Sequence, residues 1–398
     1  MKFDSFRDTW AEVSLNAVRG NLHQFRKFIG QRVKLMAVVK ADGYGHGAVE
    51  VSKAAIASGA DYLAVAILDE ALELREAGIS HPLLILGYTP ERSVRTAIMN
   101  QITLSVASMD MLDSIITQAQ LLKMTAGIHL KIDTGMSRFG VVSQTEAVEM
   151  ALKAASSNYI RLEGIFTHFA NADSPDASYT HLQFERFQRV LQGIKEAGVE
   201  IPLQHCCNSA AAMNYPSMHL DMVRIGIALY GLYPDSTLKK HPIQLKPAMA
   251  LKTKISMVKE VPATQPVGYG CTWTTSRDSI LAILPIGYAD GFSRLLSNRI
   301  NLLVHEQSAP LVGRVCMDQA ILNVTKISSC QPGDTVTIFG RDGSAFQSVD
   351  EIAEKIGTIN YEVVCMVGKR VPRLFIDSRG NEIELDQRNT HPLVIGAS

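Results

Sequence analysis

Lys40 begins the segment of this chain whose residue types are best suited to chemistry. It follows the apolar run Lys34–Val39 and is the first residue of Lys40–Gly47, which reads KADGYGHG. A lysine at the end of a buried strand loses hydration, and this lowers the pKa of its ammonium group and favours the neutral amine that forms a Schiff base. The glycines let the backbone approach a ligand closely. The alternative is an ordinary surface lysine, which is the commoner fate of this residue type.

Four further polar clusters lie at the ends of apolar runs. They are Lys131–Arg138, His168, Asn208–Ser209 and Arg224–Ile227. Taken singly, each has an ordinary structural explanation, because an arginine can pair with a carboxylate and a histidine can be satisfied within the core. Their shared position is what favours a function, since the carboxyl ends of parallel barrel strands meet at one rim, where active sites lie.

The last two of these clusters suggest where a phosphate could bind. Phosphate sites of such barrels favour the loops after the seventh and eighth strands. Here these loops hold the hydroxyl of Ser209 and the backbone N–H groups of Gly226 and Ile227. A helix N-cap is an equally good explanation for Ser209, and a cap and a phosphate ligand are compatible.

The elements that position these clusters alternate in type along the chain. Short apolar runs alternate with segments of helical periodicity, such as Met109–Leu121 and Thr180–Ala197. This pattern predicts an α/β protein with a (β/α)8 barrel of the TIM type over residues 13–243, although an open parallel sheet is an alternative. The predicted strands are Lys34–Val39, Tyr62–Ala66, Leu83–Leu86, Ile102–Val106, Ile128–Ile132, Leu162–Thr167, Leu203–Cys206 and Met222–Ile225.

The sequence pattern changes after the proline-containing junction Leu238–Pro247. Short β-rich runs now alternate with Gly/Pro turns, which predicts a smaller C-terminal antiparallel β-domain over residues 244–398, joined by residues 1–12. The predicted strands are Leu251–Val258, Ile280–Ile283, Ile300–Val304, Ile321–Val324 and Thr335–Phe339.

The composition argues against several classes of function. The chain has 39 Lys plus Arg and 39 Asp plus Glu among 398 residues, so no overall basic field attracts nucleic acid or acidic lipid. No apolar run approaches the ~18 residues that cross a bilayer. The six cysteines are scattered without C-x-x-C spacing. We therefore expect a cytoplasmic protein with no disulfide framework and no metal site.

Lys40–Gly47 closely resembles the pyridoxal-phosphate attachment motif of the alanine racemase family, which belongs to the fold-type III pyridoxal-phosphate enzymes. The resemblance covers essentially the whole chain, including the second domain. It departs at Cys206 and Cys207, where less thiol is expected, and this bears only on thiol sensitivity. The other similar blocks are Lys131–Arg138, Gly164–Asp173, Asn208–Ala210, Asp221–Gly231, Val267–Thr274, Pro285–Gly291, Val312–Gln319 and Ile359–Val363.

The resemblance implies a homodimer that interconverts L- and D-alanine at composite active sites. Lys40 would carry pyridoxal 5'-phosphate (PLP) and act as one base, and Tyr269 of the partner subunit would act as the second base on the opposite face of the substrate. The other implied residues are Tyr44, Arg138, His168, Asn208, Ser209, Arg224, Gly226, Ile227 and Tyr361 for the cofactor, Arg138 and Met317 for the substrate carboxylate, and Asp173, Tyr288, Arg294 and Arg314 at the entrance.

Two of these residues carry more specific expectations. Arg224 would face the pyridine nitrogen, and an arginine keeps its proton because its pKa is about 12.5 or higher. The ring would then withdraw electrons weakly, which favours racemisation over transamination. Lys131 matches a lysine that is carbamylated in some family members, while the ordinary alternative is an ion pair with Asp133 or another carboxylate.

Three other functions remain open at the level of the sequence. A racemase of broader specificity would also accept serine, which differs from alanine by one oxygen. A PLP-dependent decarboxylase of the same two-domain plan would carry an acidic residue at the pyridine nitrogen and a Glu-Pro-Gly-Arg tetrapeptide, and this chain has neither. A non-enzymatic PLP carrier would be a lone barrel without the β-domain.

Overall fold

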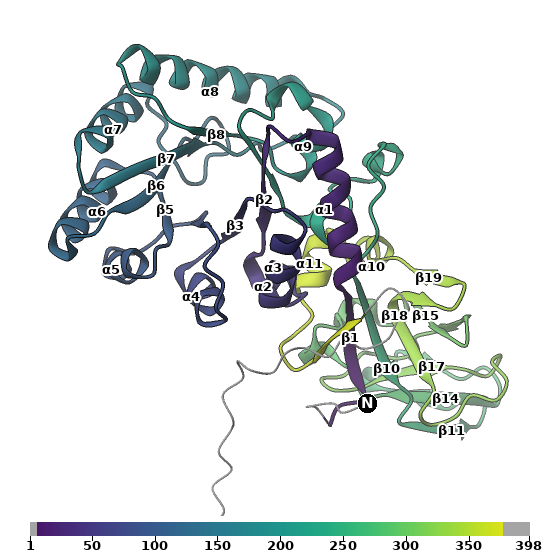
Figure 1. Ribbon diagram of the computed structural model, residues 1–398. Helices are drawn as coiled ribbons and strands as arrows, with labels where there is room; N and C mark the ends of the chain where they lie inside the picture. Colours follow the sequence, from purple (N-terminus) through teal and green to yellow (C-terminus); the bar gives the residue numbers. More distant parts are fainter. Residues whose placement is uncertain (1–5, 377–398) are drawn as a thin grey trace, which may run out of the picture.

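The computed structural model describes residues 6–376, which form a barrel and a β-rich domain packed at one of its ends (Figure 1). The segments 1–5 and 377–398, which we assign to the β-domain by sequence, lie outside the described residues. β1 (Thr9–Ser14) belongs to the β-domain, and α1 (Leu15–Ile29) follows it directly along the side of the barrel. Ser14 caps α1 by accepting a hydrogen bond from the Ala17 backbone N–H.

Eight parallel strands form the barrel sheet in the order β8-β7-β6-β5-β4-β3-β2-β9. Their residues are almost all buried, because helices cover the outer face while side chains fill the interior. The strands are β2 (Lys34–Val38), β3 (Tyr62–Val65), β4 (Leu83–Ile85), β5 (Thr103–Val106), β6 (Ala126–Lys131), β7 (Ile160–Phe166), β8 (Leu203–His205) and β9 (Met222–Ile225).

The ends of this sheet meet between β8 and β9. The backbone N–H of Asp221 donates to the Gln204 carbonyl at 3.0 Å, and that of Arg224 donates to the Cys207 carbonyl at 3.0 Å. These bonds bring the two edge strands together, so the sheet forms the nearly closed barrel that the sequence predicts.

Helices follow the strands and cover the barrel (Figure 1). The predicted segments Met109–Leu121 and Thr180–Ala197 correspond to α6 (Met109–Leu122) and α8 (Ser178–Glu196) within two residues at each end. The barrel helices are α1, α2 (Lys40–Tyr44), α3 (Ala48–Ala57), α4 (Leu68–Glu76), α5 (Glu91–Met99), α6 (Met109–Leu122), α7 (Gln144–Ser156), α8 (Ser178–Glu196) and α9 (Ser209–Asn214).

The β-domain contains one large sheet and two smaller ones. In the large sheet the order is β16-β15-β18-β10-β1-β20, with β19 paired to β18; the small sheets are β11-β14-β17 and β12-β13. The strands are β10 (Met249–Lys254), β11 (Met257–Val261), β12 (Pro266–Val267), β13 (Trp273–Thr274), β14 (Ser279–Leu284), β15 (Asn301–Val304), β16 (Gln307–Pro310), β17 (Ala320–Asn323), β18 (Thr335–Asp342), β19 (Ala345–Gln347) and β20 (Arg373–Ile376).

The predicted strand Leu251–Val258 is wrong in one respect. It is interrupted at Ile255 and Ser256, so its residues belong to β10 and β11, which lie in different sheets. A continuous apolar pattern does not reveal which neighbouring strand each of its residues pairs with. The fold class is nevertheless confirmed as a barrel with a smaller, mainly antiparallel β-domain; the pair β1–β20 is parallel.

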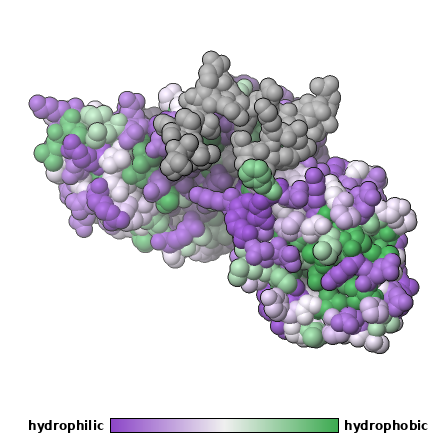
Figure 2. Space-filling view, turned by 90° about the horizontal axis from the view of Figure 1, so that it is seen from below, coloured by the Kyte–Doolittle hydropathy of each residue, from purple (hydrophilic) through white to green (hydrophobic). Residues whose placement is uncertain are grey.

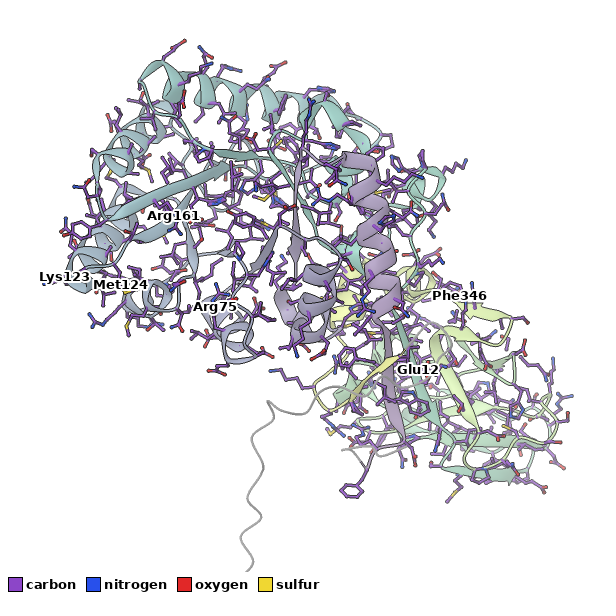
Figure 3. The ribbon with its side chains drawn as sticks, viewed as in Figure 1. Glu12, Arg75, Lys123, Met124, Arg161 and Phe346 are labelled. Atoms are coloured by element: carbon purple, nitrogen blue, oxygen red, sulfur yellow. The ribbon has the colours of Figure 1, made fainter. Side chains whose placement is uncertain are left out.

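Two helices of the β-domain join it to the barrel. α10 (Val349–Ile356) leads into α11 (Asn360–Cys365), which packs on the segment after β2. A Cβ atom on Gly45 would lie 2.3 Å from the Val364 carbonyl oxygen, so only glycine permits this approach. The side chains of Glu12 on β1 and Phe346 on β19 mark the β-domain in Figure 3. No helix within residues 6–376 is both long and apolar enough to cross a membrane.

Candidate active site

The segment after β2 places Lys40 at the mouth of the barrel. The Lys40 Nζ atom lies 5.9 Å from the centroid of the Tyr44 ring. Burial lowers the pKa of Lys40, and the nearby Arg138 guanidinium lowers it further, while Glu70 opposes the shift. A lowered pKa increases the fraction of neutral amine, which is the form that attacks a carbonyl or accepts a proton.

Tyr44, Ser209 and Gly226 form a cradle beside this lysine. The Gly226 backbone N–H donates to Ser209 Oγ at 2.9 Å, and a Cβ atom on Gly226 would lie 2.6 Å from Tyr44 Oη. The suggested N-cap role of Ser209 is wrong, because Asn208 caps α9 by accepting from the Ala211 N–H at 2.9 Å. The hydroxyl of Ser209 is thereby free to face the loop after β9 rather than its own helix.

Tyr361 enters the same cradle from the β-domain. It lies on α11, with its ring centroid 6.3 Å from that of Tyr44. Burial raises the pKa of both phenols, so both are neutral hydrogen-bond donors at physiological pH. Asp173 lies near enough to raise the pKa of Tyr361 further. The structure therefore brings Tyr361 and Asp173 to the same side of the mouth.

Arg224 is buried at the centre of the mouth and is only 3% exposed. Its guanidinium donates to His205 Nδ1 at 2.9 Å and to the carbonyls of Thr167 and Cys206, and it lies 3.2 Å from His168 Nδ1. No carboxylate hydrogen-bonds or pairs with it within residues 6–376. Burial lowers its pKa to about 10, so Arg224 remains protonated at neutral pH.

A chain of buried side chains continues from Arg224 into the barrel interior. Because a guanidinium only donates, His205 accepts at Nδ1 and carries its hydrogen on Nε2, which donates to His129 Nδ1 at 2.9 Å. His129 Nε2 then faces Glu163 at 3.9 Å, and Glu163 pairs with Arg161, which is labelled in Figure 3. Burial lowers the pKa of His129 to about 3 and that of His205 well below its usual value. Both rings are neutral, and the chain holds Arg224 in one orientation.

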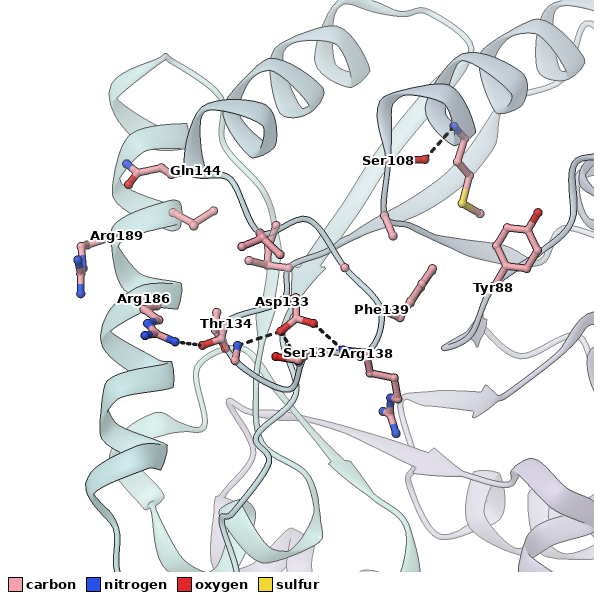
Figure 4. A pocket seen from close by; sticks show the side chains of 17 residues that line it. Tyr88, Ser108, Asp133, Thr134, Ser137, Arg138, Phe139, Gln144, Arg186 and Arg189 are labelled. Atoms are coloured by element: carbon pink, nitrogen blue, oxygen red, sulfur yellow. Dashed lines mark hydrogen bonds between the residues drawn. The ribbon is translucent and has the colours of Figure 1, made fainter.

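Lys131 and the loop after it form another part of the rim. Lys131 is 5% exposed, donates from Nζ to the Ile132 carbonyl at 2.9 Å, and has a pKa lowered to about 7, chiefly by burial. The predicted alternative of an ion pair with Asp133 is absent from the described residues. The Asp133 carboxylate instead accepts three backbone N–H groups of the loop, including that of Arg138 (Figure 4). The exposed Arg138 side chain extends from this loop.

The same loop borders a surface pocket of about 890 Å³ (Figure 4). Arg186 of α8 donates to the Thr134 carbonyl on its wall, at 3.0 Å. Arg138 belongs to both this pocket and the surroundings of Lys40, so the pocket lies beside the mouth.

The remaining predicted site residues gather on the β-domain, where Arg314 is half-buried and the others are exposed. Tyr269 is 70% exposed, Met317 is 54% exposed and Tyr288 is 44% exposed. No hydrogen bond, ion pair or ring contact within residues 6–376 joins these three to Lys40 or Arg224. Viewed from below, the β-domain shows apolar surface among polar surroundings (Figure 2).

Backbone contacts hold this exposed cluster together. The N–H of Tyr288 donates to the Cys316 carbonyl at 3.0 Å, beside Met317. A Cβ atom on Gly270, the neighbour of Tyr269, would lie 3.2 Å from the Arg314 guanidinium carbon. Burial raises the pKa of Cys316, and Arg294, on the short helix η6 (Arg294–Leu296), lies close enough to oppose this rise. Residues distant in sequence thus share one face of the β-domain.

Comparison with known proteins identifies the family of this chain. The family model for the alanine racemase N-terminal domain matches residues 13–234, and that for the C-terminal domain matches residues 248–375. The chain belongs to the alanine racemase family. It is 53% identical to alanine racemase 2 of Oceanobacillus iheyensis, over 94% of each chain.

Solved structures of the alanine racemase family show the same fold. The alanine racemase of Bacillus anthracis with bound L-Ala-P has a TM-score of 0.91 and 38% identity, covering 96% of this chain and 98% of that one. The histidine racemase of Leuconostoc mesenteroides subsp. sake has a TM-score of 0.87 and 30% identity, covering 94% and 99%. The chain is therefore an enzyme of the racemase class, while the fold itself accommodates more than one amino acid.

The structure of this alanine racemase family member adds residues that sequence reasoning missed. His205 and His129 were hidden inside predicted strands, where only an inward-facing position distinguishes them from other strand residues. Cys365 lies near Lys40, since each affects the other's pKa. Its spacing of four residues from Tyr361 on one helix is the signal that could have revealed it.

Proposed function

We propose that this protein is a PLP-dependent alanine racemase that interconverts L- and D-alanine in the cytoplasm. The observation that carries the proposal is Arg224, which is buried among neutral imidazoles and carbonyls at the centre of the mouth without a carboxylate partner in the described chain. The names of its relatives, at 41–53% identity, support alanine as the substrate. The six cysteines are all free, which is consistent with a reducing compartment.

The residues of the mouth fit PLP. A phosphate would be held by the Tyr44 and Tyr361 hydroxyls, Ser209, and the N–H groups of Gly226 and Ile227, where a Cβ atom on Gly226 would fill the space. Asn208 would support this site through its cap of α9. When bound, PLP withdraws electrons and so stabilises negative charge at the α-carbon of the amino acid.

Arg224 would face the pyridine nitrogen, with His168 beside it. Since the pKa of Arg224 remains about 10, the guanidinium keeps its protons at neutral pH and donates a hydrogen bond rather than a proton. The hydrogen bond to His205 holds the Arg224 guanidinium in one orientation and so fixes the direction in which Arg224 donates. By donating without giving up its proton, Arg224 would leave the pyridine nitrogen unprotonated, which would favour immediate return of a proton to the α-carbon.

Racemisation requires a proton to leave one face of the α-carbon and another to arrive at the opposite face. Lys40, whose pKa is lowered by burial, would exchange the proton on one face. Tyr269 of the partner subunit would exchange it on the other. A phenol with an ordinary pKa of about 10 is a weak base at neutral pH, so nearby cations such as Arg224 would be needed to lower it.

The exposed β-domain cluster supports a homodimer with composite sites. Tyr269 and Met317 are exposed and, within residues 6–376, do not contact Lys40 or Arg224 of their own barrel. A two-fold dimer would bring them to the mouth of the other subunit. There the Met317 backbone and Arg138 would bind the substrate carboxylate. The entrance would be narrowed by residues from both subunits, namely Asp173, Tyr288, Arg294, Arg314 and Tyr361.

Lys131 is proposed to be carbamylated. Carbamylation requires a neutral amine to attack carbon dioxide, and a pKa of about 7 leaves a large neutral fraction at physiological pH. The resulting carbamate is an anion that would face the cations Arg138 and Arg224, both of which already affect the Lys131 pKa. The new charge would orient the Arg138 side chain, which is otherwise exposed.

The experiment that tests this function is incubation of the purified holoenzyme with each L-amino acid, followed by chiral separation of the products. Formation of D-alanine from L-alanine, with little D-serine from L-serine, is expected. Comparable D-serine would indicate a broader racemase, and release of carbon dioxide would indicate a decarboxylase. Bound PLP without turnover would indicate a carrier. Absence of D-alanine would refute the proposal.

A further inference from the structure

The backbone directly after Lys40 has an unusual left-handed conformation. Ala41, Asp42 and Tyr44 each have φ of 52°, and Gly43 and Gly45 have φ of 61° and 79°. Residues with side chains rarely adopt this conformation, and a succession of them forms the strained left-handed turn 41–45. Strain of this kind persists only where surrounding contacts hold it.

His46 makes two of the contacts that hold this turn, beside the Glu70 carboxylate, which accepts from the Ala41 N–H, and the Asp42 carboxylate, which accepts from the Ala48 N–H. Its Nδ1 lies 3.1 Å from the Gly43 carbonyl oxygen and 2.9 Å from the Tyr44 carbonyl oxygen. Carbonyl oxygens only accept, so Nδ1 must carry the hydrogen and donate it to both. The side chain is fully buried, and burial lowers the pKa of His46 to about 4, so the ring is neutral at physiological pH.

The His46 ring is also linked, through Tyr230, to the strand that precedes Lys40. Its centroid lies 4.5 Å from that of Tyr230, whose ring in turn lies 5.0 Å from Tyr44. The Tyr230 hydroxyl donates to the Val38 carbonyl at the end of β2, at 3.0 Å. His46 therefore contacts the turn through its Nδ1–H and contacts Tyr230 through its ring, and Tyr230 is in turn hydrogen-bonded to the end of β2.

We propose that His46 is a positioning residue for the cofactor site, because its Nδ1–H holds the left-handed turn 41–45 and so sets the Lys40 amine and the Tyr44 hydroxyl relative to each other. This inference rests on the proposed function, in which Lys40 and Tyr44 bind opposite ends of PLP. If His46 served only to fill space, an apolar side chain of similar size would replace it without effect on cofactor binding.

The test compares His46→Asn with His46→Gln and His46→Leu. Asparagine places an amide N–H near the position of Nδ1, glutamine places it one bond further out, and leucine retains bulk without a donor. The dissociation constant for PLP is measured by titration of the apoenzyme and followed by fluorescence, together with the visible absorption of the bound cofactor, kcat and KM. His23→Leu, on the exposed face of α1, is the control.

We expect His46→Asn to bind PLP nearly as tightly as the unchanged protein. His46→Leu and His46→Gln should bind it about tenfold more weakly, the effect of losing one well-placed hydrogen bond. They should also shift the visible band and lower kcat more than they raise KM.

Equal PLP affinity in all three variants would overturn the proposal, as would losses that appear only in the melting temperature of the apoenzyme. If His46→Leu does not fold, the comparison of His46→Asn with His46→Gln is sufficient, because equal affinity for PLP in these two variants would also overturn the proposal. Failure of the proposed function is a separate outcome, because the unchanged protein would then bind no PLP or produce no D-alanine.

Discussion

The barrel mouth and the β-domain cluster differ in how completely their contacts are satisfied. Arg224 and Lys131 are 3% and 5% exposed, and each hydrogen-bonds to groups of its own barrel. Tyr269 and Met317 are 70% and 54% exposed on the other domain. A side chain that would act as a base or bind a carboxylate needs surroundings that exclude water. The barrel half of the proposed site is therefore buried and hydrogen-bonded within a single chain, whereas the β-domain half is exposed to solvent in that chain.

The largest effect should follow a change in the buried half, at Lys40. Lys40→Ala removes both the proposed attachment point and one base, so racemisation should fall by about 10⁴-fold or more. The measurement is chiral product analysis together with borohydride reduction and mass mapping of the cofactor-labelled peptide. Lys34→Ala, at the exposed start of β2, is the matched control and should retain activity. A labelled lysine that persists in Lys40→Ala would show that another lysine carries the cofactor.

A change in the exposed half should matter almost as much. Tyr269→Phe removes the proposed second base and should slow racemisation by about 10²–10⁴-fold. Mixing this variant with Lys40→Ala by co-refolding tests whether the two halves come from different chains. Random pairing makes half of the dimers mixed, and each mixed dimer has one intact site, so about one quarter of all sites should recover. Each variant refolded alone is the control. No recovery, with heterodimers seen by mass spectrometry, would place both residues in one chain.

The centre of the buried half can be altered without removing either base. Arg224→Glu should allow the pyridine nitrogen to be protonated, slowing racemisation by about 10²-fold. It should also raise the ratio of pyruvate to D-alanine, because a more electron-withdrawing ring permits transamination. Arg224→Lys keeps the charge and should leave this ratio nearer its original value. If the ratio is the same in all three proteins, Arg224 does not control the ring.

A smaller effect is expected at Lys131, on the rim between the two halves. Bicarbonate should raise the activity of carbon dioxide-depleted enzyme by up to about tenfold, through a charge that orients Arg138. Native mass spectrometry should show one added carbon dioxide per subunit. Lys131→Gln should abolish both the added mass and the response to bicarbonate. Plain lysine in the mass spectrum, with no response to bicarbonate, would contradict the proposal.

The smallest effect concerns stability against acid, which should depend on buried histidines of the barrel half. The folded-state pKa values of His46 and His129 are about 4 and 3, below the unfolded value of about 6.5. The unfolded chain therefore binds these protons first, and the stability that these two neutral histidines contribute, fully present above pH 6.5, is lost as pH falls toward 4.

Thermal melts between pH 8 and 4 measure this loss. His129→Gln should reduce the slope of unfolding free energy by about 1.4 kcal/mol per pH unit within that window. His23→Gln, exposed on α1, is the control. An unchanged slope in His129→Gln would show that His129 is protonated in the folded barrel.

Much of the barrel half could be predicted because its signals are local. The strands are short apolar runs, and in several of them polar residues lie at or just beyond the carboxyl end, so Lys40, His168, Ser209 and Arg224 could be assigned to one rim once eight runs were counted. The β-domain was less predictable. Leu251–Val258 appeared continuous, since the pattern of apolar residues does not record where a strand changes its partner.

The sequence by itself determined the fold class, the family and which residues are chemically suited to the site, because periodicity and motif spacing are properties of the chain. Only the tertiary structure decided the hydrogen-bonded order Arg224–His205–His129 and the contact of His46 with the turn after Lys40. These contacts join separate strands or depend on left-handed backbone, and neither is encoded by a local pattern. The exposure of Tyr269 was likewise decided by packing, since whether a side chain is covered depends on every element around it.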